Sequence, residues 1–128
     1  MMKTTYWYVL ILIVIVGLLF FFKQDNSPTT NEPVVSAYDT FGTCLANAGA
    51  KFYGAFWCPH CQDQKELFRD SKTIPYVECS TEDGEGQTQI CIDEGITGYP
   101  TWKFADGAIM NGAQQLSVLA NKTNCPLP

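Results

Sequence analysis

Hydrophobic and polar residues follow one another along this chain of 128 residues in blocks that predict distinct elements. From Tyr6 to Phe22 no residue is charged, and nearly all are aliphatic or aromatic. A helix of that length, at about 1.5 Å per residue, just reaches across a hydrocarbon core of about 30 Å. We therefore expect residues 1–23 to form one transmembrane signal-anchor. Residues 24–37 are polar with two prolines, which predicts a flexible tether.

A cleaved signal peptide is the alternative for the N-terminal segment. Its apolar region usually runs for about 7–15 residues and ends at a site of small residues. Here the apolar run ends in three phenylalanines and Lys23, with no Ala-x-Ala pattern nearby. The sequence therefore favours an uncleaved membrane anchor over residues 6–22. Lys3 and Lys23 flank it on opposite sides, so the positive-inside rule does not orient it.

The third block, residues 38–128, has the patterns of one α/β domain. Asp39 is placed to cap its first helix and Gly49 to end it. The periodicities predict helices at about 39–48, 58–69, 87–94 and 114–122, and strands at 51–56, 75–79, 101–104 and 108–110. In the third of these helices we expect Ile90 and Cys91 to face the core. A crossover after each early strand and a final hairpin predict a mixed sheet with helices on both faces.

Cys58 and Cys61 lie where the first predicted strand gives way to a helix, which is a suitable place for reversible dithiol chemistry. Only a thiolate attacks a disulfide. Cys58, at the helix start beside unpaired N–H groups, is the predicted nucleophile. Cys61, one turn later, is predicted to be less exposed and to close the ring. Pro59 fits the first helical turn, and His60 is predicted to stabilise the Cys58 thiolate.

Metal binding is the alternative for this cysteine pair. Structural zinc usually takes four ligands from two such pairs, and the sequence has no second one. Haem attachment requires His directly after Cys61, where Gln62 stands. We therefore expect neither a metal nor another cofactor. The net charge of −5 argues against nucleic acid as a partner.

Three features together resemble the thioredoxin-like family over about residues 51–122. They are Trp57-Cys58-x-x-Cys61 at a strand-to-helix turn, the run from Gly95 to Thr101, and the Asp106-Gly107 hairpin followed by Gly112 and a helix. Residues 52–61, 76–79 and 98–102 are more similar still to the thioredoxin-like partner domain of bacterial and plant homologues of vitamin K epoxide reductase. In that family the domain passes oxidising equivalents between a membrane quinone-linked oxidase and secreted thiol proteins. This chain lacks the four-helix oxidase, so we expect that partner to be a separate protein.

The resemblance also assigns roles to single residues. It implies that Pro100 is a cis-proline facing the cysteine pair, and that the backbone of Tyr99 pairs with a bound substrate strand. Trp57 and Pro59 are further candidates for substrate contact. The Pro-His dipeptide resembles that of periplasmic disulfide-forming oxidases and favours an oxidase. One position departs from the family, because Phe52 stands where a buried acid usually lies, six residues before the first cysteine.

The six cysteines indicate an oxidising compartment, so we expect the domain to be periplasmic or extracellular. The four cysteines outside the pair allow three pairings. Related domains also tend to carry two cysteines near Cys79 and Cys91, which implies that bridge and leaves Cys44 for Cys125. A second redox relay at Cys79 and Cys91 is the alternative to a structural bridge.

The function that these features predict is a thiol-disulfide oxidoreductase acting on secreted or periplasmic thiol proteins, coupled to a vitamin K epoxide reductase-like membrane oxidase. Two alternatives stay open. One is a dedicated reductase, of the kind that keeps cytochrome c precursors reduced. The other is a non-catalytic redox-sensing or chaperone-like binding module.

Overall fold

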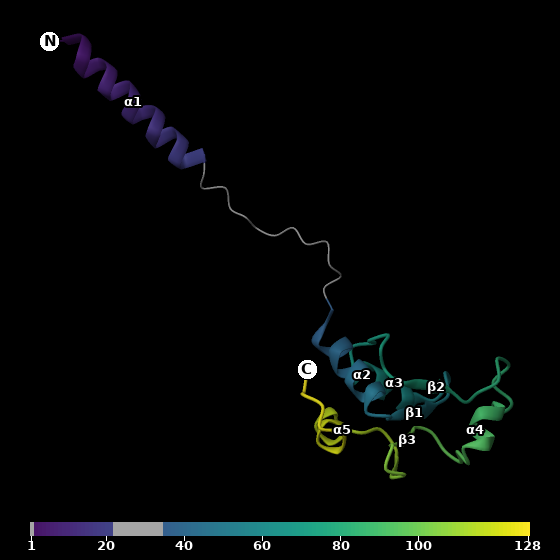
Figure 1. The fold of residues 1–128 in the computed structure, drawn as a ribbon. Coiled ribbons are helices and arrows are strands. Elements are labelled where there is room, and N and C mark those ends of the chain that lie inside the picture. Colours follow the sequence, from purple (N-terminus) through teal and green to yellow (C-terminus); the bar gives the residue numbers. More distant parts are fainter. Residues whose placement is uncertain (1, 22–34) are drawn as a thin grey trace. The chain divides into compact units, whose positions relative to one another are not determined.

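The computed structural model describes residues 2–21 and 35–128, in two units that are treated separately here. The N-terminal unit contains helix α1, Met2–Phe21 (Figure 1). Its large apolar side chains from Tyr6 to Val16 are exposed. Within the two described ranges, no helix is both long and apolar enough to cross a membrane. The predicted transmembrane helix is therefore not confirmed, and residues 24–34 of the predicted tether lie outside the described residues.

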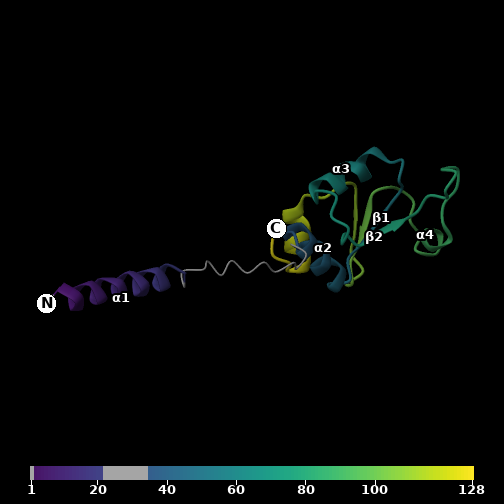
Figure 2. The same ribbon diagram turned by 90° about the horizontal axis from the view of Figure 1, so that it is seen from above.

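The second unit is a mixed α/β domain, which is consistent with the expected thioredoxin-like fold (Figures 1 and 2). Four strands lie in the order β2-β1-β3-β4, with β1 parallel to β2 and antiparallel to β3, and β3 antiparallel to β4. Its elements are α2 Ala37–Asn47, β1 Lys51–Gly54, α3 Pro59–Leu67, β2 Tyr76–Glu78, α4 Gln89–Asp93, β3 Thr101–Lys103, β4 Ile109–Asn111 and α5 Leu116–Thr123. The predicted terminal hairpin is the β3–β4 pair.

The sheet carries helices on both faces, as the sequence predicts. Successive residues of a strand point to opposite faces, so Phe52 and Tyr53 of β1 enter different clusters. Phe52 lies in the larger one, with buried residues of α2, α3 and α5. Tyr53 packs with Cys79, Ile96 and the α4 residue Cys91. In both views of the ribbon, α4 lies apart from α2 and α5 (Figures 1 and 2).

The first helix of the domain begins earlier than predicted. Ser36, not Asp39, is its N-cap, and Asp39 lies in the first turn. The Ser36 hydroxyl accepts a hydrogen bond from the Asp39 backbone N–H at 3.0 Å, and the Asp39 carboxylate accepts one from the Ser36 backbone N–H at 3.3 Å. This reciprocal pair is a capping box, which satisfies two backbone donors at once. Gly49, at φ 78°, follows the helix end as predicted.

Ile90 was predicted to face the core, and that prediction is wrong. Ile90 is 50% exposed, whereas Cys91 is fully buried. Helix α4 has only five residues, so it offers one side to the sheet, and the Cys91 disulfide sets which side that is. The apolar pattern alone could not choose between two neighbouring positions.

Two disulfides join the pairs that the sequence analysis favoured. Cys44 of α2 is bonded to Cys125, just after α5, and Cys79, just after β2, is bonded to Cys91 of α4. Each bond therefore fixes a helix near the edge of the domain. Cys58 and Cys61 are the two cysteines left as free thiols.

Candidate active site

The two free thiols lie where β1 passes into α3. Cys58 is the N-cap of α3, with an extended backbone (φ −79°, ψ 118°), and Pro59 occupies the first helical turn. The Cys58 side chain makes no capping hydrogen bond to the first turn of α3. Cys58 therefore lies at the positive end of the α3 helix dipole, next to backbone N–H groups that the helix itself leaves unpaired.

Cys58 and Cys61 differ in their access to solvent. Cys58 is 6% exposed and Cys61 is fully buried. Burial, and then the hydrogen bond with Cys58, raise the pKa of the Cys61 thiol to about 12. Cys61 is therefore the less exposed of the two thiols, as the sequence predicted, and its neutral form is favoured.

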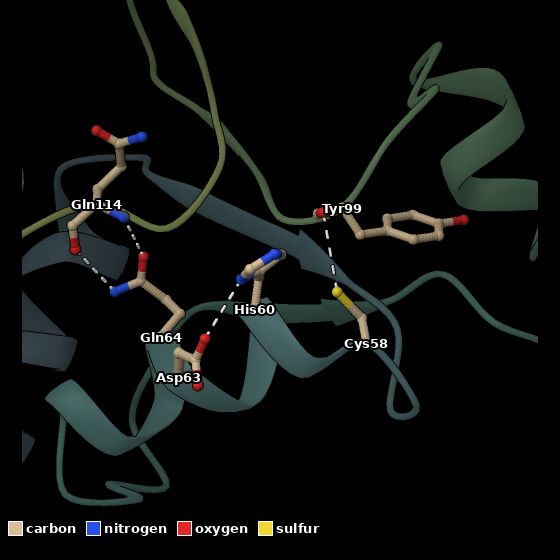
Figure 3. Close-up of polar contacts among 6 residues, drawn as sticks. All are labelled: Cys58, His60, Asp63, Gln64, Tyr99 and Gln114. Atoms are coloured by element: carbon tan, nitrogen blue, oxygen red, sulfur yellow. Dashed lines mark hydrogen bonds and ion pairs between the residues drawn. The ribbon is translucent and has the colours of Figure 1, made fainter.

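The Tyr99–Pro100 peptide bond is cis, as the family resemblance implies, and it lies beside Cys58. The Cys58 thiol donates to the Tyr99 carbonyl oxygen across 3.8 Å (Figure 3). The Tyr99 ring points away from the sulfur in this view. The backbone before Pro100 is thus placed beside the thiol, where an extended substrate chain could pair with it.

His60 does not hydrogen-bond Cys58 in the structure. Its Nδ1 lies 3.3 Å from Oδ2 of Asp63, one turn further along α3, and both side chains are largely exposed (Figure 3). The predicted effect of His60 on Cys58 therefore stays a prediction.

Trp57 lies on the surface beside Cys58. It is 52% exposed, its indole Nε1 donates to the Ser80 hydroxyl at 2.8 Å, and its ring meets the Tyr99 ring edge to face. Trp57 and Tyr99 border an open hollow of about 520 Å³; its other lining residues are Gly84, Glu85, Gly86, Gln87, Ile96 and Thr97. The hollow thus places aromatic and polar side chains next to the cysteine pair. Trp102, by contrast, is a fully buried core residue.

Residues that the sequence analysis did not select complete the buried side of the site. Gln64 of α3 is fully buried and accepts a hydrogen bond from Trp102. It also hydrogen-bonds Gln114 (Figure 3). Tyr76 and Glu78 lie on β2, where the Tyr76 hydroxyl donates to Glu78 Oε2 at 2.8 Å. The sequence pattern alone puts Tyr76 and Glu78 on one face of a strand, because residues two apart on a strand share a face. Nothing in the local pattern showed that this face meets the cysteines.

The described residues include no cluster of three or more His, Cys, Asp or Glu side chains placed to hold a metal ion. The chemistry that the site offers is that of its two thiols. One is near the surface beside a backbone carbonyl, and the other is buried behind it.

Comparison with known proteins supports this assignment. No family model matches the chain. It is 42% identical over 88 residues to the thiol-disulfide oxidoreductase LTO1 of Arabidopsis thaliana, a member of the vitamin K epoxide reductase family with a thioredoxin-like domain. The match covers 65% of this chain and 23% of LTO1, so the chain spans about a quarter of that relative's length. The similarity confirms the resemblance that the sequence motifs indicated.

Proposed function

We propose that this chain is a thiol-disulfide oxidoreductase that exchanges disulfides with secreted or periplasmic proteins through Cys58 and Cys61. The observation that carries the proposal is the division of the six cysteines. Four form two disulfides, and the remaining two are free thiols at the start of α3, beside the Tyr99 carbonyl. The likeness to LTO1, itself a thiol-disulfide oxidoreductase, supports it independently.

In the oxidising direction, the pair starts as a Cys58–Cys61 disulfide. A substrate thiolate attacks Cys58 Sγ, the bond to Cys61 breaks, and Cys61 leaves as a thiolate that takes up a proton. A second substrate thiolate then attacks the substrate sulfur of the mixed disulfide and releases Cys58. Two electrons pass from the substrate to the pair, and the substrate gains one disulfide. The reducing direction is the same sequence in reverse.

We further propose that the chain works as an oxidase, recharged by a vitamin K epoxide reductase-like membrane protein that passes electrons to a quinone. Support comes from the sequence resemblance and from the Pro59-His60 dipeptide. His60 lies in the first turn of α3. A positive charge at that position would stabilise a Cys58 thiolate, and with it the reduced form, and so make the disulfide more oxidising.

We place the domain outside the cytoplasm, anchored to a membrane through residues 6–22. The two disulfides of the domain support an oxidising compartment. The uncharged apolar character of residues 6–22 supports the anchor. Retention of the full chain in membranes washed with alkaline carbonate, compared with a chain starting at Val35, tests it. Release of both chains by the wash would exclude the anchor.

Trapping of mixed disulfides tests the proposed exchange. In a Cys61→Ala variant no internal thiol can release the substrate, so thiol proteins of the same compartment should accumulate on Cys58 as adducts that a reductant dissolves. The Cys58→Ala, Cys61→Ala double variant is the matched control and should trap none. Equal labelling of both variants would refute a Cys58 nucleophile.

The redox state of the wild-type pair in the cell separates the alternatives. A mostly oxidised pair is expected for an oxidase, and a mostly reduced pair identifies a reductase. A binding module would form no adducts through Cys58 and would not turn over reduced protein substrates. The reduction potential of the purified chain gives the same answer, because an oxidase should lie well above the roughly −270 mV of thioredoxin.

A further inference from the structure

The second step of exchange leaves a gap in the site. In the reducing direction, Cys61 must lose its proton before it can attack Cys58 in the mixed disulfide, yet Phe52 stands at the position of the family's usual acid. We propose that the Glu78 carboxylate, acting through the Tyr76 hydroxyl, takes up the proton that Cys61 releases. The inference rests on the proposed exchange at Cys58 and Cys61 and adds positioning residues on the neighbouring strand.

Strand register places this pair on the same face as the buried thiol. In the parallel pairing of β1 with β2, Phe52 lies opposite Tyr76 and Gly54 lies opposite Glu78. Residues two apart share a face, so all four lie on the side of the sheet that packs against α3. The acid missing from β1 is thus matched by an acid on the same face of the adjacent strand.

Gly54 allows the Tyr76 ring and the Cys61 sulfur to approach each other. A Cβ atom at Gly54 would lie 2.9 Å from Cys61 Sγ and 2.9 Å from Cε2 of Tyr76. The sulfur and that ring carbon are therefore at most 5.8 Å apart. Cε2 is bonded to the carbon that carries the hydroxyl, so the hydroxyl-bearing side of the ring is turned toward the thiol. Proton transfer between the two groups requires one bridging water molecule or a small movement of the ring.

The Glu78 carboxylate is held in place by three donors. Oε2 accepts from the Tyr76 hydroxyl at 2.8 Å, and Oε1 accepts from the backbone N–H groups of Phe56 at 3.1 Å and Ser80 at 2.9 Å. Phe56 lies two residues before Cys58, so the carboxylate is tied to the loop that presents the nucleophile. These contacts fix its orientation toward the site.

The charged and titratable groups facing this pair are few. Lys65 of α3 places its Nζ 3.7 Å from the Tyr76 ring centre, and its positive charge lowers the pKa of Cys61 against the larger effect of burial. Cys58 and Cys61 face Tyr76 from the start of α3. Burial, and then the hydrogen bond to Glu78, raises the pKa of Tyr76, so its hydroxyl keeps a proton to pass on. Lys65 and Tyr76 also line a surface pocket of about 210 Å³, which opens the Tyr76 side of the relay to solvent.

The proposed step balances as follows. In the mixed disulfide, the Cys61 proton passes to the Tyr76 oxygen while the Tyr76 proton passes to Glu78. The Cys61 thiolate attacks Cys58 Sγ, the Cys58–Cys61 bond forms, and the bond from Cys58 to the substrate sulfur breaks. The substrate leaves as a thiolate and takes a proton from water. When the pair acts as an oxidant, Glu78 returns the proton to the departing Cys61 thiolate by the same route.

The test uses the full reduced chain in detergent and the chromogenic disulfide dithiobis(nitrobenzoate) in equimolar amount. Cys58 attacks the reagent and releases one coloured thiolate, and Cys61 then releases the second from the mixed disulfide. The two releases are followed by stopped flow between pH 6 and pH 10. The second is intramolecular, so its rate does not depend on protein concentration.

Glu78→Gln and Tyr76→Phe should each slow the second release at pH 7 by about 10- to 100-fold, in the lower part of the range for general base catalysis. The first release should keep its wild-type rate. The deficit should shrink as the pH rises, since hydroxide then removes the Cys61 proton. Glu78→Asp should recover part of the loss. Glu94→Gln is the matched control. It removes a carboxylate that pairs with Lys103, whose side chain lies on the face of the sheet opposite Phe52.

Wild-type rates and pH profiles for the second release in both variants would overturn the inference. So would an equal slowing of both releases in both variants, because that pattern indicates a structural role at the loop. Failure of the proposed exchange itself looks different, because the wild-type chain would then release only one thiolate. Tyr76→Phe keeps the ring, so a folded variant is available if Glu78→Gln is unstable.

Discussion

Oε1 of Gln64, on α3, accepts a hydrogen bond from the indole Nε1 of Trp102, on β3, at 3.1 Å, and both side chains are fully buried. The same oxygen accepts from the Gln114 backbone N–H at 2.6 Å, and the Gln64 amide donates to the Gln114 carbonyl at 3.0 Å. One side chain therefore joins the active-site helix to the central sheet and to the segment before α5. The position of Cys58 and Cys61 over the sheet depends on it.

Replacing Gln64 by Leu should destabilise the domain by about 2–4 kcal/mol, because the buried Trp102 indole N–H and the partly buried Gln114 backbone N–H lose their acceptor. Urea unfolding of the domain measures this cost. Gln89→Leu is the matched control, since Gln89 is exposed and bonds only Asp93 among its side-chain contacts. A Gln64→Leu variant as stable as the control would show that the buried network contributes no net stability.

The two disulfides should differ in their contribution to stability. In the chain-entropy model, the Cys44–Cys125 bond, with a separation of 81 residues, contributes about 4.5 kcal/mol, and the Cys79–Cys91 bond, with a separation of 12, contributes about 3 kcal/mol. Double alanine variants of each pair, unfolded in urea, test the order. A larger loss from the shorter loop would mean that native packing, not loop entropy, sets their values.

The pair Cys79–Cys91 should also resist reduction under conditions that open Cys58–Cys61. Its sulfurs are fully buried beneath Tyr53, whereas Cys58 reaches the surface. Peptide mapping after mild reduction measures which bonds open. Reduction of both pairs at similar reductant concentrations would instead identify the second pair as a redox relay.

Gly54→Ala should disturb the site directly. The new methyl group would meet Cys61 Sγ and the Tyr76 ring at 2.9 Å, which is closer than real Cβ contacts. Overpacking of this kind costs about 1–3 kcal/mol, and it should also slow the second thiolate release by separating Cys61 from Tyr76. Gly98→Ala is the control, since a Cβ there meets no atom within 4 Å. Equal stability and rates in the two variants would show that the contact relaxes without consequence.

The raised pKa of Cys61 predicts a pH dependence of stability. The folded value of about 12 lies above the ordinary 9.0, so the neutral thiol contributes its full stability below about pH 9. That contribution is lost as the pH rises from about 9 toward 12, because the unfolded chain releases the proton first. A Cys58→Ala chain should therefore lose more unfolding free energy between pH 8 and pH 10 than the Cys58→Ala, Cys61→Ala chain. Parallel losses would place the Cys61 pKa near its ordinary value.

Much of the site could be predicted because its signals are local in sequence. The change from strand to helix pattern around Cys58 defines a helix start, and the Pro59 ring fits only its first turn. The cis bond before Pro100 followed from the family resemblance and not from local pattern. Element bounds were less accurate: β1 ends at Gly54 instead of Phe56, and Ser36 instead of Asp39 caps α2. Those bounds depend on hydrogen-bond partners that a pattern of apolar residues does not identify.

By itself, the sequence determined which residues can do chemistry here: the two cysteines at a helix start, the cysteines left to pair elsewhere, and the loss of the usual acid at Phe52. Only the tertiary structure decided what replaces that acid. Glu78 lies 20 residues after Cys58 in a strand of ordinary composition, and nothing in that strand points to the thiols. The parallel register of β1 and β2 puts Tyr76 and Glu78 on the face of the sheet that packs against Cys61, and the absence of a side chain at Gly54 leaves space for the approach. Distance along the chain carries no information about such contacts, because strand pairing and side-chain packing alone create them.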